Sequence, residues 1–349
     1  MSLTWSKTKL EYLREKFSGS NSGDIHDEHF KEIANHISGK GGYRTAPYAG
    51  ISTFLNAPVI APSEDSFTEL QVAISGMPMD MGVTNRSGAR FGPRALRTIE
   101  VVGPYNDGLR VAPVQEMRVA DVGDVPFSSR YDLHQSHAEI ETFIGNIVKN
   151  GTLPLSVGGD HSISHPILKA VGRERPVGML HLDAHCDTGG PIGGERFHHG
   201  GPFRNAVLDG VLDPERTIQI GIRGSTEYIW EFSKASGMTV VYAHEFQQRP
   251  ITSIIQQAKD VLQDGPVYIS FDVDSLDPAF APGTGTPETA GLTPREVQTL
   301  LRGLKGLNVV GGDVTEVSPN YDPTSNTAQN GAQALFEILS LMYFSPSLK

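Results

Sequence analysis

Short apolar runs alternate with longer amphipathic segments from about residue 70 to the C-terminus. The apolar runs predict strands at 70–75, 117–122, 153–157, 177–183, 217–222, 238–242, 267–272 and 307–314. Helical periodicity predicts helices near 93–100, 132–150, 162–172, 203–210, 225–236, 245–263, 293–305 and 327–343. Strands that are apolar throughout and are each followed by a helix are typical of a parallel sheet with helices on both faces. We therefore expect a single α/β domain over residues 66–349, with a mainly parallel sheet of about eight strands.

Residues 1–65 lack this alternation. Short helices are expected at 4–16 and 28–37, and the Gly- and Pro-rich stretch after them cannot be regular structure throughout. This stretch also carries large apolar side chains that are costly to leave in water, namely Tyr43, Tyr48, Phe54 and Leu55. We expect an N-terminal arm that packs on its own subunit or on a neighbouring one.

The net charge and the cysteine content argue against several classes of function. The chain has 349 residues and a net charge of −11, which disfavours nucleic-acid backbones and anionic membrane surfaces as partners. We find neither an apolar run of the ~18 residues that would span a bilayer nor a secretory signal pattern. The single cysteine, Cys186, cannot form an internal disulfide, so we expect a cytoplasmic protein.

Metal-binding residue types cluster where three of the predicted strands end. The sequence GGDHS follows the strand at 153–157 and contains Asp160 and His161. Two further strands run into such clusters, which contribute Asp183, His185, Asp187, Asp272 and Asp274. Alternate positions in an extended chain point to one face, and the carboxyl ends of parallel strands meet at one edge of the sheet. We therefore expect these side chains to converge.

Taken singly, these motifs are weak, because a lone histidine at a strand end is usually structural and a lone DxD is often a turn. Together they bring four carboxylates to a buried edge, where mutual repulsion and lost hydration are costly. Two divalent cations would balance the four negative charges. Carboxylates with imidazoles suit manganese, iron, cobalt, nickel or zinc, whereas Cys186 should turn away from the site. A pair of such cations typically lowers the pKa of a shared water, which indicates a hydrolase.

Two other segments could contribute to this site. The sequence FHHGGPFRN places His198 and His199 before a Gly-Gly pair, and DVTEVSP places Glu316 just after the last predicted strand. Glu316 could anchor a cationic group through charge-assisted hydrogen bonds, or it could be a helix cap or a surface residue. Residues 79–94 are a candidate lining loop, with Asp80, Asn85, Arg86 and Arg90, although Arg90 and Arg94 could equally be structural.

The motifs GGDHS, HLDAHCDT, SFDVDSLDPAFAPGTGTPE and DVTEVSP, in this order, resemble the ureohydrolase family of arginases and agmatinases. Residues 76–97 are also similar to an agmatinase-type segment. The resemblance implies a three-layer α/β/α fold, a binuclear metal centre and hydrolysis of a guanidino group to urea. It also implies ligand roles: His161 and His185 each bind one cation, Asp183 and Asp272 bridge both, and Asp187 and Asp274 complete the two sets.

The same resemblance implies roles in the reaction. Asp274 would receive a proton from the attacking water, His199 would carry a proton to the leaving amine, and Glu316 would hold the guanidinium. HHGGPFR and PETAGL stand where many agmatinases have HGTPFR and PEVGGL. DAHCDTGG together with HHGGPFR and the long arm resembles a branch with guanidine hydrolase and metformin hydrolase subunits. Members of that branch are associated with nickel, so we expect Ni²⁺ or Mn²⁺.

We therefore expect a hydrolase of guanidine, a methylated guanidine or a biguanide such as metformin. The alternative is an agmatinase or guanidinobutyrase that acts on a longer-tailed guanidine. A non-catalytic subunit of a hetero-oligomer is a hypothesis of another class, but such a chain should have lost ligands, and here all six are present. A deacetylase on the related fold would lack the full carboxylate set. Family members usually form trimers or hexamers, in some cases with a homologous sister subunit, and the arm could serve that assembly.

Overall fold

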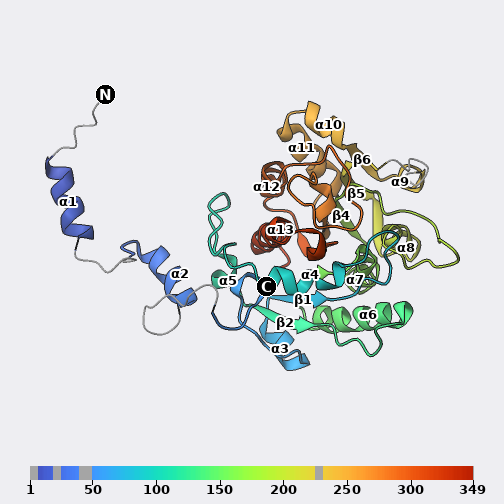
Figure 1. The fold of residues 1–349 in the computed structure, drawn as a ribbon, viewed down its shortest axis with the longest axis horizontal. Coiled ribbons are helices and arrows are strands. Elements are labelled where there is room, and N and C mark those ends of the chain that lie inside the picture. The colour runs from blue at the N-terminus through green and yellow to red at the C-terminus, as the bar shows by residue number, and fades with distance from the viewer. Residues whose placement is uncertain (1–6, 19–24, 39–48, 225–230, 349) are drawn as a thin grey trace. The chain divides into compact units, whose positions relative to one another are not determined.

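The computed structural model describes residues 7–18, 25–38, 49–224 and 231–348 (Figure 1). The chain divides into two compact units, residues 1–49 and 50–349. The first unit contains α1 (Lys7–Phe17) and α2 (Glu28–Ser38), close to the helices expected from the sequence.

The second unit contains one eight-stranded sheet, and every strand pair in it is parallel. The strands are β1 (Val72–Met77), β2 (Val119–Asp124), β3 (Leu153–Gly158), β4 (Val177–Leu182), β5 (Leu212–Ile222), β6 (Thr239–Tyr242), β7 (Val267–Asp272) and β8 (Val309–Thr315). Their spatial order is β2-β1-β3-β8-β7-β4-β5-β6. The predicted parallel α/β fold is confirmed, because each predicted strand matches an observed one and strands such as β1, β4 and β7 are buried throughout.

Helices cover both faces of this sheet (Figure 1). The helices of this unit are α3 (Glu64–Glu69), α4 (Gly92–Arg97), α5 (Pro113–Glu116), α6 (Leu133–Lys149), α7 (Ser164–Val171), α8 (Pro202–Leu208), α9 (Glu231–Ser236), α10 (Ala243–Gln248), α11 (Ile251–Leu262), α12 (Pro294–Gly303) and α13 (Asn326–Tyr343). One apolar cluster draws side chains from α4, α11, α12 and α13, and the other from α3, α6, α7 and α8. The molecule therefore has three layers.

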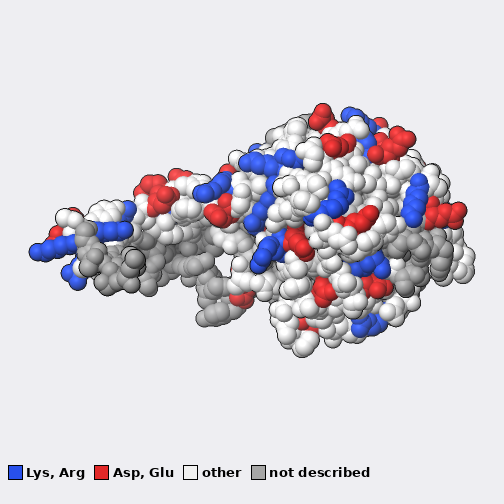
Figure 2. All heavy atoms as spheres, turned by 90° about the horizontal axis from the view of Figure 1, so that it is seen from above, with Lys and Arg blue, Asp and Glu red and all other residues white. Residues whose placement is uncertain are grey.

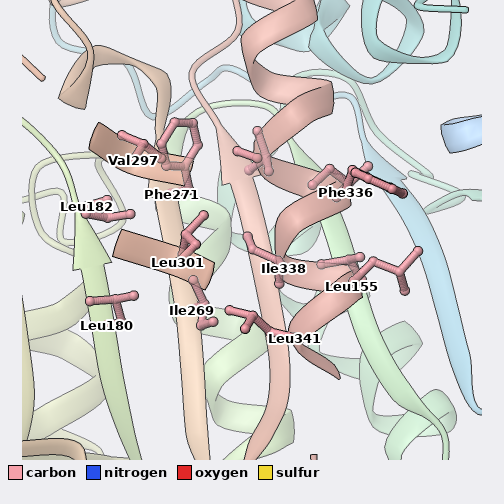
Figure 3. Packing of buried hydrophobic residues seen from close by; sticks show 14 of the residues in the cluster. Leu155, Leu180, Leu182, Ile269, Phe271, Val297, Leu301, Phe336, Ile338 and Leu341 are labelled. Atoms are coloured by element: carbon pink, nitrogen blue, oxygen red, sulfur yellow. The ribbon is translucent and has the colours of Figure 1, made fainter. Parts of the chain in front are cut away.

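The central strands separate the two apolar clusters by their alternation. In β7, Ile269 faces the first cluster, while its neighbour Tyr268 belongs to the second. Figure 3 shows Ile269 packed among side chains of α12 and α13, including Leu301 and Ile338. All four of these side chains are fully buried, so each contributes on the order of 1.5–3 kcal/mol of hydrophobic free energy.

One predicted helix is wrong in its extent. The pattern at 245–263 predicts a single helix, but the structure has α10 and α11, which are separated at Arg249 and Pro250. Proline lacks the amide N–H that would continue the first helix, and the residue before it is disfavoured in helical conformation. The first half of the helix predicted at 225–236 lies outside the described residues.

Residues 50–57 pack in the second unit, although the sequence analysis assigned them to the arm. Phe54 is fully buried, its amide N–H donates to Asp121 Oδ2 (3.1 Å), and the Arg97 guanidinium lies 4.0 Å from its ring centroid. Val59 then pairs with Asp121 beside strand β2. Phe54 and Leu55 of this segment are thus part of the core of the α/β domain.

Charged side chains are interspersed over the surface. On the face in Figure 2, basic and acidic residues alternate over the α/β domain. None of the helices in the described part of the chain is both long and apolar enough to cross a bilayer.

We predict that Phe54→Ala lowers the free energy of unfolding by about 3–5 kcal/mol, because it leaves a large cavity in the core. Denaturant unfolding measures the change. Ile51→Ala is the matched control, since Ile51 is 84% exposed, and it should change stability by less than about 0.5 kcal/mol. Equal effects of the two substitutions would contradict the packing of this segment in the core.

Candidate metal centre

The candidate ligands lie at the carboxyl ends of three strands, β3, β7 and β4. Only β8 separates β3 from β7 in the sheet, and β7 is adjacent to β4. His161 follows β3, Asp183 follows β4, and Asp272 is the last residue of β7. Each of these three side chains is at least 97% buried. The strand order therefore brings together residues that are more than 100 positions apart in the sequence.

The first group of ligands surrounds one nitrogen of His161. Its Nδ1 lies 3.1 Å from Asp183 Oδ2, 2.9 Å from Asp187 Oδ2 and 3.2 Å from Asp272 Oδ2. The second group surrounds His185, whose Nδ1 lies 3.4 Å from Asp183 Oδ1 and 3.2 Å from Asp274 Oδ2. Asp183 thus contributes one oxygen to each group. The six predicted ligands form two adjoining sets with a shared carboxylate.

The tautomer of His161 shows that the first set suits a cation. Ser270 Oγ donates to Asp313 Oδ1 (2.7 Å), so it accepts the Nε2–H of His161 (2.8 Å). This arrangement leaves a lone pair on Nδ1, which has no hydrogen-bond partner although it is buried. The lone pair therefore faces three carboxylate oxygens. Without a positive charge between these atoms the arrangement is repulsive, and a divalent cation satisfies all four of them.

The pKa shifts of the ligand residues also indicate that this site needs a positive charge. Burial, together with the charges of Asp274 and Asp183, raises the pKa of Asp272 well above its ordinary value. Burial lowers the pKa of His161, but the neighbouring carboxylates of Asp183, Asp187 and Asp272 outweigh it and raise that pKa well above its ordinary value. In the absence of a cation, protons must supply the positive charge that the cluster lacks.

The ligands converge by tight turns and not by extended alternation, which corrects the sequence-based reasoning. The strand β4 ends at Leu182, and the His185 amide then donates to Asp183 Oδ1 at 2.6 Å. Asp187 has a φ of +51°, in the left-handed region. After β7, residues Val273–Ser275 form a 3₁₀ turn in which the Asp274 amide donates to Asp272 Oδ1 at 2.8 Å. Cys186 is buried against Ile222 and is not part of either ligand set.

Sequence reasoning missed His181, which supports the shared carboxylate. Its Nε2 donates to Asp183 Oδ2 (2.8 Å), and its Nδ1 accepts from Gln219 Nε2 (3.0 Å). His181 also lies close enough to His161 and Asp183 to be a candidate ligand. Since both of its nitrogens are hydrogen-bonded, we assign it to orienting Asp183. The spacing His181-x-Asp183 on one strand face is the signal that could have revealed it.

Glu316 lies beside the first ligand set and is 99% buried. Its Oε1 accepts from the His161 amide (2.8 Å) and from His199 Nδ1 (2.9 Å), whereas its buried Oε2 has no partner among the described residues. The Glu316 backbone has a φ of +62°, a conformation that is strained for a residue other than glycine. A Cβ at Gly285 would lie 3.5 Å from Oε2, so a glycine there keeps the approach to this oxygen open.

His199 is held between two neighbours with opposite effects. Burial lowers its pKa, but the carboxylate of Glu316 outweighs this and raises the pKa to about 9. On the other side, the Thr84 amide points at Nε2 from 3.0 Å, which suits a neutral imidazole, and Thr84 Oγ1 lies 2.7 Å from the same nitrogen. The effect of Glu316 on the pKa of His199 is larger than that of Thr84, because a carboxylate acts through its charge and an amide only through its dipole. Thr84 was not identified from the sequence.

The remaining candidates have structural contacts. His198 Nε2 donates to the carbonyl of Gly190 (2.9 Å), which fixes the loop before His199. Asn85 and Arg86 both donate to the carbonyl of Gly285, at 3.1 and 3.2 Å, so they tie the 79–94 segment to the loop beside Glu316.

Two charged residues of that segment pair with each other, and a third lies on the surface. Asp80 is buried and forms an ion pair with Arg90. Arg94 is exposed on α4. The carboxylate of Asp160, a third member of the GGDHS motif, accepts from the amides of Gly82 and Ser162 and is likewise structural.

We predict that Asp272→Asn reduces the number of tightly bound divalent cations from two per polypeptide to at most one. The amide keeps the shape of the side chain but removes a negative charge from the ligand set around His161. Elemental analysis after dialysis measures the content. Asp260→Asn, on the exposed surface of α11, is the control and should retain both cations. Full cation content in the Asp272 variant would contradict its role as a metal ligand.

Known proteins resemble this chain over the whole α/β domain. The model of the Arginase family matches residues 70–340. A guanidinopropionase from Pseudomonas aeruginosa is 47% identical over 302 residues, which cover 84% of this chain and 92% of that protein. A mitochondrial agmatinase from Gallus gallus is 46% identical over 84% of this chain and 86% of its own length. A mitochondrial guanidino acid hydrolase from Homo sapiens is 44% identical over 83% and 82%.

A solved structure agrees with these sequence relatives. Proclavaminate amidino hydrolase from Streptomyces clavuligerus matches with a TM-score of 0.81 and 34% identity, and the match covers 86% of this chain and 100% of that one. The fold, the ligand geometry and the sequence relatives agree with one another. This chain therefore belongs to the arginase family and is a metal-dependent ureohydrolase of guanidino compounds.

Proposed function

We propose that this protein hydrolyses an ω-guanidino acid to urea and the corresponding amino acid, with a pair of Mn²⁺ or Ni²⁺ ions. The observation that carries the proposal is the state of Glu316. One of its carboxylate oxygens is fixed by His161 and His199, and the other is buried, unpartnered and beside the candidate metal centre. A guanidinium offers planar N–H donors that suit such an oxygen.

The relatives support a tailed substrate better than guanidine or metformin, which the sequence analysis favoured. Guanidinopropionase and guanidino acid hydrolase, by their names, act on substrates that end in a carboxylate. Agmatine, which ends in an amine, is the second candidate because of the 46% identity to an agmatinase. The guanidino acids and agmatine share an alkylguanidine and differ mainly in the group far from the scissile bond, so they can be compared in one assay.

The described residues would hold the cations in two sets with a shared carboxylate. His161, Asp187 and Asp272 with Asp183 suit one cation, and His185 and Asp274 with Asp183 suit the other. When bound, such cations supply Lewis acidity and lower the pKa of a water nearby. Buried carboxylates and imidazoles without other counter-charges are suited to this role.

The protein's own groups then handle orientation and protons. Glu316 Oε2 binds the guanidinium and fixes the carbon that the water attacks. Asp274 lies at the same edge of the sheet. Its Oδ1 accepts from the Ala184 amide (3.1 Å) and its Oδ2 from Thr286 Oγ1 (3.2 Å), which orient the carboxylate to take a proton from the attacking water. His199 holds a proton at Nε2 for the amine that leaves, so urea and an ammonium product result.

We predict that Glu316→Gln lowers kcat/KM by roughly 10- to 150-fold, because it removes a charge-assisted hydrogen bond worth about 1.5–3 kcal/mol. Steady-state urea release measures this loss. The cation content of the variant should stay at the wild-type value, since Glu316 contacts the ligand His161 only through its amide. Loss of cations together with activity would show that Glu316 is a metal ligand and not the guanidinium anchor.

We further predict a ranking among substrates. Urea release should be fastest with guanidinopropionate or guanidinobutyrate, slower with agmatine, and slowest with guanidine and metformin. The assay compares these five compounds on enzyme that is stripped of metal and reconstituted separately with Mn²⁺ and with Ni²⁺. Preference for metformin or guanidine with either metal would refute the tailed substrate and favour the first expectation from the sequence.

A further inference from the structure

We propose that Arg223 is the positioning residue of the second cation site, defined as the set His185, Asp274 and the shared Asp183. Its side chain fastens the two loops that border this site to the end of β5. The inference rests on the proposed function in one respect, namely that His185 and Asp274 hold a cation. Arg223 is part of no motif on which the sequence analysis based the site.

Within the described part of the chain, the guanidinium of Arg223 donates only to main-chain carbonyl groups. These acceptors belong to three chain segments, and they are Gly221 (3.1 Å), Asp274 (2.7 Å), Ser275 (3.3 Å), Leu276 (3.2 Å), Glu288 (2.7 Å) and Thr289 (3.0 Å). One acceptor is thus the carbonyl of a predicted ligand, Asp274. A planar guanidinium with five N–H donors is the only side chain that can join so many acceptors at once.

The backbone of Arg223 reaches the third segment of the site. Its amide and that of Gly224 both donate to the carbonyl of Ala184, at 2.9 and 3.0 Å. Ala184 lies between the ligands Asp183 and His185. One residue therefore links β5 to the turn that carries His185 and to the turn that carries Asp274.

Neighbouring glycines leave the space that this arrangement needs. A Cβ at Gly291 would lie 2.5 Å from Arg223 Nη2, and a Cβ at Gly224 would lie 2.8 Å from His185 Cδ2. Any side chain at position 291 would displace the guanidinium, and one at 224 would push on the imidazole ring. The packing around Arg223 and the packing around the ligand His185 are thus directly coupled.

Because Arg223 binds the carbonyl of Asp274, it does not occupy the carboxylate oxygens of that residue. Among the described residues no carboxylate forms an ion pair with Arg223, although its charge lies near Asp274 and Asp183. An arginine that bound the Asp274 carboxylate directly would compete with a cation for the same oxygens. An arginine that holds the Asp274 carbonyl fixes the ligand and leaves its oxygens available.

Glu288 connects Arg223 to the Nε2 side of the His185 ring. Arg223 holds the carbonyl of Glu288 (2.7 Å), and Glu288 Oε1 lies 3.6 Å from His185 Nε2. A carboxylate near the second nitrogen of a ligand histidine favours the tautomer that leaves Nδ1 free for a cation. Arg223 therefore acts on His185 from both sides, through Ala184 and through Glu288.

The chain offers a matched control at the other end of the same strand. Arg216 in β5 also donates only to carbonyl groups, those of Leu262 (2.8 and 3.1 Å) and Pro266 (3.1 Å). It faces the amino ends of the neighbouring strands, away from the ligands. Arg216 lies within β5 and Arg223 directly follows that strand, so Arg216→Gln reports the general effect of losing a carbonyl-bound guanidinium.

The test is a competition titration of the metal-free variants with Mn²⁺ against a chromophoric chelator, with a thermal unfolding curve for each. We expect Arg223→Gln to bind one Mn²⁺ with wild-type affinity and the second at least about tenfold more weakly. Arg216→Gln should bind both with wild-type affinity. With excess Mn²⁺, Arg223→Gln should recover kcat while KM stays unchanged, which a general structural defect would not produce.

If the Arg223→Gln variant binds both Mn²⁺ ions with wild-type affinity, the proposal is overturned. Should that variant fail to fold, Arg223→Lys decides, since it keeps the charge but loses the planar donors, and it too should bind the second ion more weakly. Wild-type affinity for both ions in Arg223→Lys would then overturn the proposal. Fewer than two bound ions in the wild-type protein would instead refute the metal centre, and with it the proposed function.

Discussion

The rest of the structure depends on the crowding of four carboxylates at a buried edge of the sheet. Asp183, Asp187, Asp272 and Asp274 approach two imidazoles at the carboxyl ends of neighbouring strands, where water is largely excluded. Such a cluster is unfavourable unless positive charge enters it. The surrounding protein is built to hold these groups together despite their repulsion, and the same repulsion gives the site its affinity for cations.

The supporting contacts extend well beyond the ligands. Asp313, fully buried, accepts hydrogen bonds from Ser164, Tyr268 and Ser270, and Ser270 in turn fixes the tautomer of His161. In the same way, Gln219 fixes the tautomer of His181, and His181 orients the carboxylate of Asp183. These chains of hydrogen bonds run along the strands into the apolar layers, so that the rigid sheet determines the positions of the reacting groups.

The sequence predicted the strands well because a doubly covered parallel sheet buries its inner strands throughout, and the apolar runs are then clear. It also predicted which strand ends meet, since charge clusters at those ends are informative. It did not predict the turns that aim Asp187 and Asp274, because these depend on φ angles and amide contacts. The sequence did not indicate Arg223 and Thr84, because their contacts involve backbone carbonyl and amide groups. Every residue type has such groups, so the sequence pattern does not reveal them. Pro250, by contrast, is visible in the sequence, and it marks the break between α10 and α11 that helical periodicity alone does not predict.

The left-handed backbone at Glu316 and Asp187 has an evolutionary consequence. Each such residue costs on the order of 1–3 kcal/mol relative to relaxed backbone, and glycine would remove most of that cost. Glycine, however, would also remove the carboxylate. These two positions are therefore places where a more stable protein is a less active one, and stabilising substitutions found by selection for heat resistance alone should accumulate there only at the expense of turnover.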